Sequence, residues 1–386
     1  MPVPIQSHMH SALCTLIVPH SELRTAQSDQ VRPSQTFETM LPRQSQPLSG
    51  LPRKRRASLG HARLILKRAR SATVAPCISI FHPASGIRYS PPVQFQKVTI
   101  IGVGLLGGSL GLAARRRKLA GEVAGFVRRE VSLKACEKAG AVDYATTDLL
   151  AAVSQADLVI LCTPLAQMRP LAQQFLPALK RGAIVTDVGS VKADVVREVG
   201  AVVHQVGAHF VGSHPMAGGE KMGVLAARAD LYANAACVIT PGEKTNANAV
   251  RKLEKFWQAL GARTVRMDPA QHDLLVSRSS HLPHVAAAAL VNLILHPAGP
   301  QTQADLCAAG FRDTTRIASG SPEMWRDIAL ANRKNLSRAL DAFMVELENF
   351  QKALKRNDAP AIEEFFARAK QRRDDWCACG ISTSPE

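Results

Sequence analysis

The chain has 386 residues, of which 46% are hydrophobic, and a formal net charge of +17. This apolar content is ordinary for a folded protein and excludes a wholly disordered chain. No stretch reaches the roughly 18 uninterrupted apolar residues of a membrane span, so a membrane protein is not expected. A length of this kind predicts two or three domains of about 150 residues each.

A basic leader opens the chain. Residues 1–95 hold 12 of the 48 Lys and Arg residues, three of the 31 Asp and Glu residues and eleven of the 23 prolines. No apolar period of 2 or 3.6 residues persists there, so we expect residues 1–92 to be disordered. Three roles stay open for this leader: an organelle transit peptide, a nucleic-acid or nuclear-localisation arm, or an extension without a role.

The leader carries more than half of the net charge, because 12 basic and three acidic side chains leave +9 of the +17, and the remaining 291 residues carry 36 basic and 28 acidic side chains. We therefore expect small anionic ligands, with neither nucleic acid nor a membrane as a partner. The eight cysteines show no paired spacing, which favours a reducing compartment. The expected location is the cytoplasm, or the plastid stroma if the leader is a transit peptide.

Ordered structure is expected from Val93 onwards. Residues 97–101 are a short strand rich in β-branched residues, a glycine motif follows at once, and a helical pattern then extends to Arg117. Strand, G-x-G-x-x-G and helix in this order favour a dinucleotide site, because the glycines let the backbone approach a pyrophosphate at the helix N-terminus. The expected cofactor contacts in this motif are Gly102, Gly104, Leu105, Leu106 and Gly107.

The choice between NAD and NADP depends on the end of the second strand, residues 122–127. NAD sites usually place an acid there, which bonds the ribose 2′-hydroxyl. Here Val127, Arg128 and Arg129 occupy that position. Two guanidinium groups suit a 2′-phosphate, so NADP is favoured over NAD. The alternative is that both arginines are solvated and the adenosine end is loosely held.

Strands and helices continue to alternate up to residue 265. Further strands are expected at 157–162, 182–187, 236–240 and 264–265, with helices at about 166–180 and 246–260. This alternation is typical of a doubly wound parallel sheet, which binds ligands at the carboxyl ends of its strands. Thr163, Ser190 and His214 are expected at that edge.

Only helices are predicted after Pro269. They span about 270–296, 301–318, 322–355 and 360–376, and the third repeats apolar residues at three- and four-residue steps along one face. Because long amphipathic helices must bury that face, we predict a homodimer. The predicted domains are the leader at 1–92, an α/β dinucleotide-binding domain at 93–268 and a helical substrate and dimerisation domain at 269–386.

Polar clusters that could support chemistry lie at 187–192, 212–221, 280–284 and 310–318. A dehydrogenase acting on a hydroxyl needs a base near neutral pKa, which histidine supplies, and an anionic substrate needs a guanidinium. Bland alternatives exist: Ser190 as a helix N-cap, His214 as a turn residue and Arg316 as a surface residue. His281 and His284 could share a metal on one helical face, but without Cys or carboxylate partners we predict no metal.

Five motifs, four of which contain these clusters, resemble motifs of the prephenate/arogenate dehydrogenase family of tyrosine biosynthesis and occur in the same order along the chain. The matching segments are 102–109 (GVGLLGGS), 187–192 (DVGSVK), 212–223 (GSHPMAGGEKMG), 280–284 (SHLPH) and 310–328 (GFRDTTRIASGSPEMWRDI). The resemblance implies a Rossmann-type domain followed by an all-helical dimerisation domain. It also implies oxidative decarboxylation of prephenate or arogenate, giving 4-hydroxyphenylpyruvate or tyrosine, with hydride transfer to NAD or NADP.

The resemblance further implies the roles of single residues. His214 would take the proton of the ring 4-hydroxyl, Ser190 would contact that hydroxyl and the histidine, and Arg316 would hold a substrate carboxylate. The other implied substrate-binding or gating residues are His284, His281, Arg312, Glu220 and Trp325, the last of which would reach towards the partner subunit. The alternatives are another Rossmann-plus-helical dehydrogenase of β-hydroxyacid type and a non-catalytic NADP-sensing or nucleic-acid-binding protein.

Overall fold

The computed structural model describes residues 94–378, and the leader at 1–92 lies outside them. A parallel six-stranded sheet has the order β3-β2-β1-β4-β5-β6. Its strands are β1 (Phe95–Ile101), β2 (Ala120–Phe126), β3 (Tyr144–Thr146), β4 (Leu158–Leu161), β5 (Ile184–Asp187) and β6 (His209–Phe210). The order reverses between β1 and β4, which creates a ligand-binding crevice at the strands' carboxyl ends. The predicted Rossmann-type sheet is confirmed.

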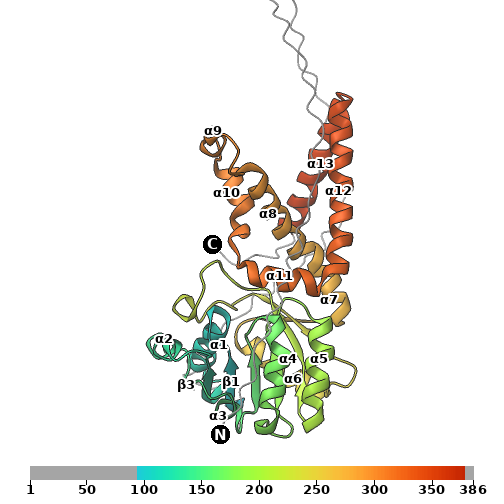
Figure 1. Cartoon of the computed structure of the whole chain (residues 1–386). Coiled ribbons are helices and arrows are strands. Elements are labelled where there is room, and N and C mark those ends of the chain that lie inside the picture. Colours follow the sequence, from blue (N-terminus) through green and yellow to red (C-terminus); the bar gives the residue numbers. More distant parts are fainter. Residues whose placement is uncertain (1–93, 379–386) are drawn as a thin grey trace, which may run out of the picture. The chain divides into compact units, whose positions relative to one another are not determined.

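Helices cover both faces of this sheet (Figure 1). They are α1 (Leu105–Arg116), α2 (Val131–Ala139), α3 (Leu149–Val153), α4 (Leu165–Phe175), α5 (Ala193–Val203) and α6 (Ala247–Ala259), with short 3₁₀ segments η1 (Leu176–Ala178), η2 (His204–Val206) and η3 (Val224–Ala226). A hydrophobic core lies on each face of the sheet, and successive side chains of β1 point into different cores. Ile100 packs in the cluster that contains Trp257, and Ile101 packs in the cluster that contains Phe175. Burial on both faces explains why the strands appear in the sequence as continuous apolar runs.

The last three strands form a separate small sheet of β7 (Gly212–Pro215), β8 (Ala236–Thr240) and β9 (Arg263–Arg266). The strands predicted at 236–240 and 264–265 do not continue the parallel sheet, so that part of the prediction was wrong. No crossover helix joins β7 to β8, so the two strands pair antiparallel, whereas α6 joins β8 to β9 and that pair is parallel. The connection from β7 to β8 instead packs η3 against α1.

Between Pro269 and residue 378, the last that the structure describes, the elements are all helical, as predicted. They are α7 (Pro269–Val276), the π-helical segment η4 (Ser277–His281), α8 (Leu282–Ile294), α9 (Gln301–Asp305), α10 (Ala309–Thr315), the 3₁₀ segment η5 (Arg316–Ser319), α11 (Pro322–Ala331), α12 (Arg333–Lys355) and α13 (Ala359–Ala378). Three predicted helices are thus interrupted. π-Helical turns are rare and are often found at functional sites, which directs attention to η4.

The break between α11 and α12 has a physical reason. Asn332 leaves the helical conformation, with φ −108° and ψ 23°, and its side chain is buried. Its amide donates to the backbone carbonyl of Asp273 at 2.7 Å, a bond that ties the break to α7. Periodicity could not show this break, because the apolar pattern continues across it.

Helices α12 and α13 run side by side (Figure 1), with the rings of Phe350 and Phe365 4.8 Å apart. Several of their large apolar side chains are exposed, among them Met344, Leu347 and Phe366. None of the helices within residues 94–378 is long and apolar enough to cross a bilayer.

Candidate active site

The glycine motif forms a tight turn between β1 and α1. Gly102 has φ +96°, and a Cβ there would lie 2.7 Å from the carbonyl oxygen of Cys162, so only glycine fits. Gly107 is equally constrained, since its Cβ would lie 2.1 Å from the carbonyl oxygen of Gly102. The Tyr232 hydroxyl donates to the Leu106 carbonyl at 2.8 Å and holds the first turn of α1 in place.

This turn fits a dinucleotide. A Cβ at Gly104 would meet nothing within 4 Å, so open space faces the N-terminus of α1, where backbone N–H groups and the helix dipole favour a phosphate. The Thr163 hydroxyl is buried after β4 and lacks a hydrogen-bond partner among the described residues. Thr163 also lies against the turn, because a Cβ at Gly102 would be 3.1 Å from the Thr163 methyl. The unpaired hydroxyl is therefore next to the glycine motif.

Arg128 and Arg129 lie beside the same turn. Gly102 donates its N–H to the carbonyl of Phe126, the last residue of β2, at 3.0 Å. Val127 is buried, whereas both arginines are exposed. Both arginines thus follow the carboxyl end of β2, the edge at which a doubly wound sheet binds its ligand.

Removing both guanidiniums, in Arg128→Ala/Arg129→Ala, is expected to raise KM for NADP at least roughly 10-fold, the loss of one such bond, and to leave KM for NAD nearly unchanged. The reason is that each charge-assisted hydrogen bond to a phosphate contributes about 1.5–3 kcal/mol. Steady-state kinetics with both cofactors measures the effect. Arg251→Ala, on the exposed face of α6, is the matched control. Equal losses with both cofactors would contradict a 2′-phosphate site.

His214 is fixed by the residue that precedes it. The Ser213 hydroxyl donates to the Asp187 carbonyl at 2.6 Å and accepts from the Trp257 indole at 3.2 Å. The fully buried Lys192 pairs its ammonium with the Asp187 carboxylate and donates to the Ser213 carbonyl at 3.0 Å. These bonds clamp β7 against the carboxyl end of β5, as expected for a side chain at the ligand-binding edge.

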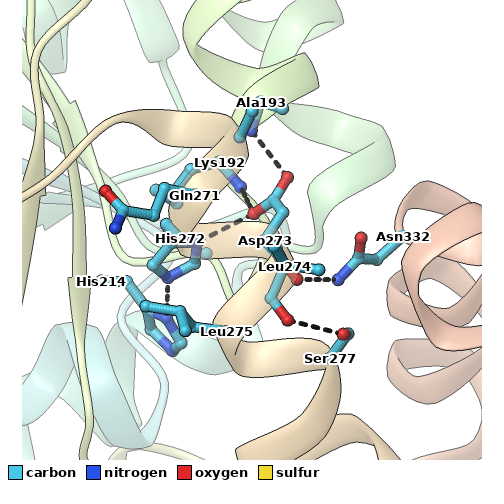
Figure 2. Close-up of polar contacts among 12 residues, drawn as sticks. Lys192, Ala193, His214, Gln271, His272, Asp273, Leu274, Leu275, Ser277 and Asn332 are labelled. Carbon is cyan, nitrogen blue, oxygen red and sulfur yellow. Dashed lines mark hydrogen bonds and ion pairs between the residues drawn. The ribbon is translucent and has the colours of Figure 1, made fainter. Parts of the chain in front are cut away.

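The imidazole of His214 is the first of three buried polar groups in a row (Figure 2). Its Nδ1 lies 2.8 Å from Nε2 of His272, and Nδ1 of His272 lies 2.8 Å from Oδ1 of Asp273. Burial, and then the proximity of His272, Lys192 and His281, lowers the pKa of His214 well below its ordinary 6.5. The imidazole is therefore neutral at pH 7 and can act as a base.

Three aromatic side chains of the helical part lie together. The rings of His284 on α8 and Trp325 on α11 are 4.0 Å apart, and His281 meets the same indole edge-on at 6.1 Å. Asn332 links His281 to α7, since its amide lies 3.3 Å from Nδ1 of His281. Burial lowers the pKa of His281 to about 4, against the opposing charge of Asp273, so this histidine too is neutral at pH 7.

Arg316 and Glu220 form an ion pair between η5 and the loop after β7. Their side chains are 67% and 44% exposed, so the pair contributes little stability and a ligand carboxylate can compete for the guanidinium. Arg312, one turn earlier on α10, is exposed. Ser190 follows β5 and is half-buried, and within residues 94–378 no hydrogen bond joins its side chain to His214.

Two models of known protein families match successive parts of the chain. Residues 110–266 match the family model described as the nucleotide-binding domain of prephenate dehydrogenase, and residues 268–368 match the one described as its dimerization domain. The chain belongs to the prephenate dehydrogenase family. The family resemblance inferred from five motifs is thereby confirmed, and a separate β-hydroxyacid dehydrogenase family is not supported.

Individual members of the family match the same region. The prephenate dehydrogenase of Bacillus subtilis is 35% identical over 279 residues, which cover 72% of this chain and 75% of the relative. The structure of Aquifex aeolicus prephenate dehydrogenase with hydroxyphenyl propionate and NAD+ is 32% identical, with a TM-score of 0.68 and coverage of 72% and 98%. Synechocystis arogenate dehydrogenase is 29% identical, with a TM-score of 0.62 and coverage of 72% and 99%. The chain is thus an oxidoreductase with a nucleotide-binding domain.

Four residues that the structure places in or behind the candidate site were not predicted from the sequence: Lys192 as a buried ammonium, His272, Asp273 and Asn332. The first was quoted only within a motif, and the others lay inside long helical patterns. The sequence did contain a signal for His272 and Asp273. They are adjacent polar residues in the first turn of a predicted helix, just after Pro269, and such a pair is unusual where a helix is buried.

Proposed function

We propose that the chain catalyses the oxidative decarboxylation of prephenate to 4-hydroxyphenylpyruvate in tyrosine biosynthesis, with arogenate as the alternative substrate. The observation that carries this proposal is a buried, neutral histidine, His214, on a strand held at the carboxyl end of β5 and followed by a loop whose Glu220 pairs with the exposed guanidinium of Arg316. The name of the Bacillus subtilis relative and the family description support prephenate. The Synechocystis relative keeps arogenate open.

In the proposed reaction the C4–H bond breaks as a hydride, and the ring carboxylate leaves as carbon dioxide. Nicotinamide supplies the hydride acceptor when the cofactor is bound. The electron pair of the broken carbon–carbon bond completes the aromatic ring. Because hydride departure leaves positive character on C4, His214 assists by drawing the proton from the 4-hydroxyl. Arg316 pairs with a substrate carboxylate in place of Glu220, and Ser190, Arg312, His281, His284 and Trp325 surround the substrate.

Further parts of the proposal concern organisation and cofactor. We place the dinucleotide-binding domain at 93–268 and the substrate and dimerisation domain at 269–386, which agrees with the break between the two matched models. NADP is favoured over NAD because Val127, Arg128 and Arg129 occupy the positions at the end of β2, where NAD sites usually place an acid. A homodimer is favoured because the helical part matches a dimerization model and exposes apolar side chains on α12 and α13.

One steady-state experiment tests the proposal. The purified chain is assayed with prephenate and arogenate, each with NAD and NADP, by reduced-cofactor absorbance and by chromatography of the aromatic product. Prephenate with NADP is expected to give the highest kcat/KM, with one 4-hydroxyphenylpyruvate formed per reduced cofactor. A preference for arogenate would replace the substrate within the same site. Absence of turnover in all four combinations would overturn the proposal.

A further inference from the structure

Two side chains of α7 stand behind His214 and touch neither the glycine turn nor the Arg316 pair. His272 and Asp273 are 0% and 3% exposed. Nothing in the proposed reaction so far uses them. Their hydrogen bonds nevertheless connect the imidazole of His214 to the N-terminus of α5 and, through Asn332, to the start of α12.

The Asp273 carboxylate has a defined role as acceptor. Oδ1 accepts the backbone N–H of Lys192 at 2.7 Å, and Oδ2 accepts that of Ala193 at 2.9 Å, where α5 begins (Figure 2). A helix N-terminus favours a negative charge at this point. Because both oxygens face backbone donors, the third partner, Nδ1 of His272 at 2.8 Å, must also donate.

The tautomers of both histidines follow from that assignment. A neutral His272 with its proton on Nδ1 has an unprotonated Nε2, which can only accept. Nδ1 of His214, 2.8 Å away, must then carry the proton of that contact. Nε2 of His214 is therefore the unprotonated nitrogen, and it alone is available to accept a proton from a substrate.

We propose that His272 and Asp273 are positioning residues that hold His214 in the tautomer with a free Nε2 and share the charge that it acquires. This inference rests on His214 being the base of the proposed function. The substrate proton goes to Nε2 of His214, and the proton on Nδ1 moves along the 2.8 Å contact to Nε2 of His272. The positive charge then lies beside the Asp273 carboxylate. When Nε2 of His214 returns its proton to the oxygen of the aromatic product, the reverse shift along the contact restores the neutral pair.

Asp273→Asn is expected to reverse the tautomers. His272 Nδ1 and the backbone N–H of Lys192 share Oδ1, whereas the N–H of Ala193 is bound by Oδ2. An asparagine whose single oxygen keeps the bond to Ala193 therefore turns its NH₂ group towards His272. His272 Nδ1 then accepts, Nε2 donates to His214, and the proton of His214 moves to Nε2, where it blocks the base. In a serine protease the equivalent Asp→Asn change costs about 10⁴-fold in kcat through the wrong tautomer. We expect a fall of about 10²–10⁴-fold in kcat with KM within about twofold of wild type.

Asp157→Asn is the matched control. Asp157 also accepts two backbone N–H groups, from Gln96 and Lys97, and one side-chain donor, Lys180. It precedes β4 and so lies at the opposite edge of the sheet from the site. A comparable loss of thermal stability in both variants, with a fall in kcat in Asp273→Asn alone, separates a positioning role from a structural one.

His272→Gln and His272→Phe distinguish the two functions proposed for His272, which are holding the tautomer of His214 and taking up its proton. The glutamine oxygen can accept from Nδ1 of His214 and keep its tautomer but cannot take up the proton, whereas phenylalanine loses both functions. We expect kcat to fall in the order wild type, His272→Gln, His272→Phe. Equal kcat in the two variants, or kcat that only follows their melting temperatures, would overturn the proposal.

Nitrogen NMR of the histidine-labelled full chain tests the tautomer without turnover. The ¹⁵N shifts of the His214 ring, assigned by their loss in His214→Asn, are expected to show a protonated Nδ1 and a free Nε2 in wild type and the reverse in Asp273→Asn. A wild-type protein with the proton on Nε2 would refute the relay, whatever the substrate. Failure of the proposed function appears elsewhere, as absence of turnover in the wild-type chain.

Discussion

Replacing His214 with asparagine is expected to lower kcat at least about 10²-fold, because general-base catalysis contributes typically 10²–10⁴-fold. Asparagine suits the test because its NH₂ group can occupy the place of Nδ1 and still donate to His272. The variant thus removes the basic Nε2 and keeps the contact behind it. Cofactor binding, measured by quenching of the chain's tryptophan fluorescence with NADPH, is expected to survive, since His214 makes no contact with the glycine turn.

The pH dependence of kcat/KM is a second test of the role of His214 as the base. Burial and the nearby His272, Lys192 and His281 hold the pKa of His214 below 6.5, so lowering the pH from 8 to 6.5 leaves the base unprotonated. The acidic limb that His214 contributes to kcat/KM is therefore expected below pH 6.5, and it should be absent from His214→Asn. A near-wild-type kcat in the variant, or an unchanged acidic limb, would remove His214 from the role of base.

Much of the fold could be predicted because local signals agreed with it. The run at 97–101, the glycine motif and the helix after it specify β1, the turn and α1 with no long-range information. The second sheet could not be predicted in the same way. The segment at 236–240 looks like any other buried strand, and only its partner, β7, makes it antiparallel. Pairing partners are tertiary information, and strand composition does not carry it.

The residues of the candidate site also differ in whether a local sequence signal marks them. His214, Arg316 and His284 lie in polar motifs interrupted by glycine or proline, which stand out from the apolar pattern and could be found. Lys192 and Asp273 act through partners distant in sequence: the lysine anchors the Ser213 carbonyl, and Asp273 caps α5 from 80 residues away. Each has an ordinary place in a helical pattern, and its burial becomes visible only when the helices are assembled.

Removing the guanidinium of Arg316 is the second large effect that we expect. Charge-assisted hydrogen bonds contribute about 1.5–3 kcal/mol each, so Arg316→Ala is expected to raise KM for the substrate roughly 10–100-fold. The carboxylate it holds is bound alike in the ground state and in the transition state, so kcat is expected to change little. Arg316→Lys should lie between the two, because an ammonium keeps the charge but loses the planar fork. Initial rates over a range of substrate concentrations at fixed cofactor measure all three.

The ion pair with Glu220 makes this prediction sharper. Since the pair is exposed, a substrate carboxylate needs to displace a partner worth at most about 1 kcal/mol. Glu220→Gln removes that competitor and is expected to lower KM severalfold at most, whereas in the Arg316→Ala background the same change should have no further effect. Arg266→Ala is the matched control, because Arg266 pairs with Glu254 between β9 and α6, away from the site. If Arg316→Ala left KM unchanged, or if Arg266→Ala raised it equally, the loss would come from general charge, and the substrate carboxylate would have to be held by another cation.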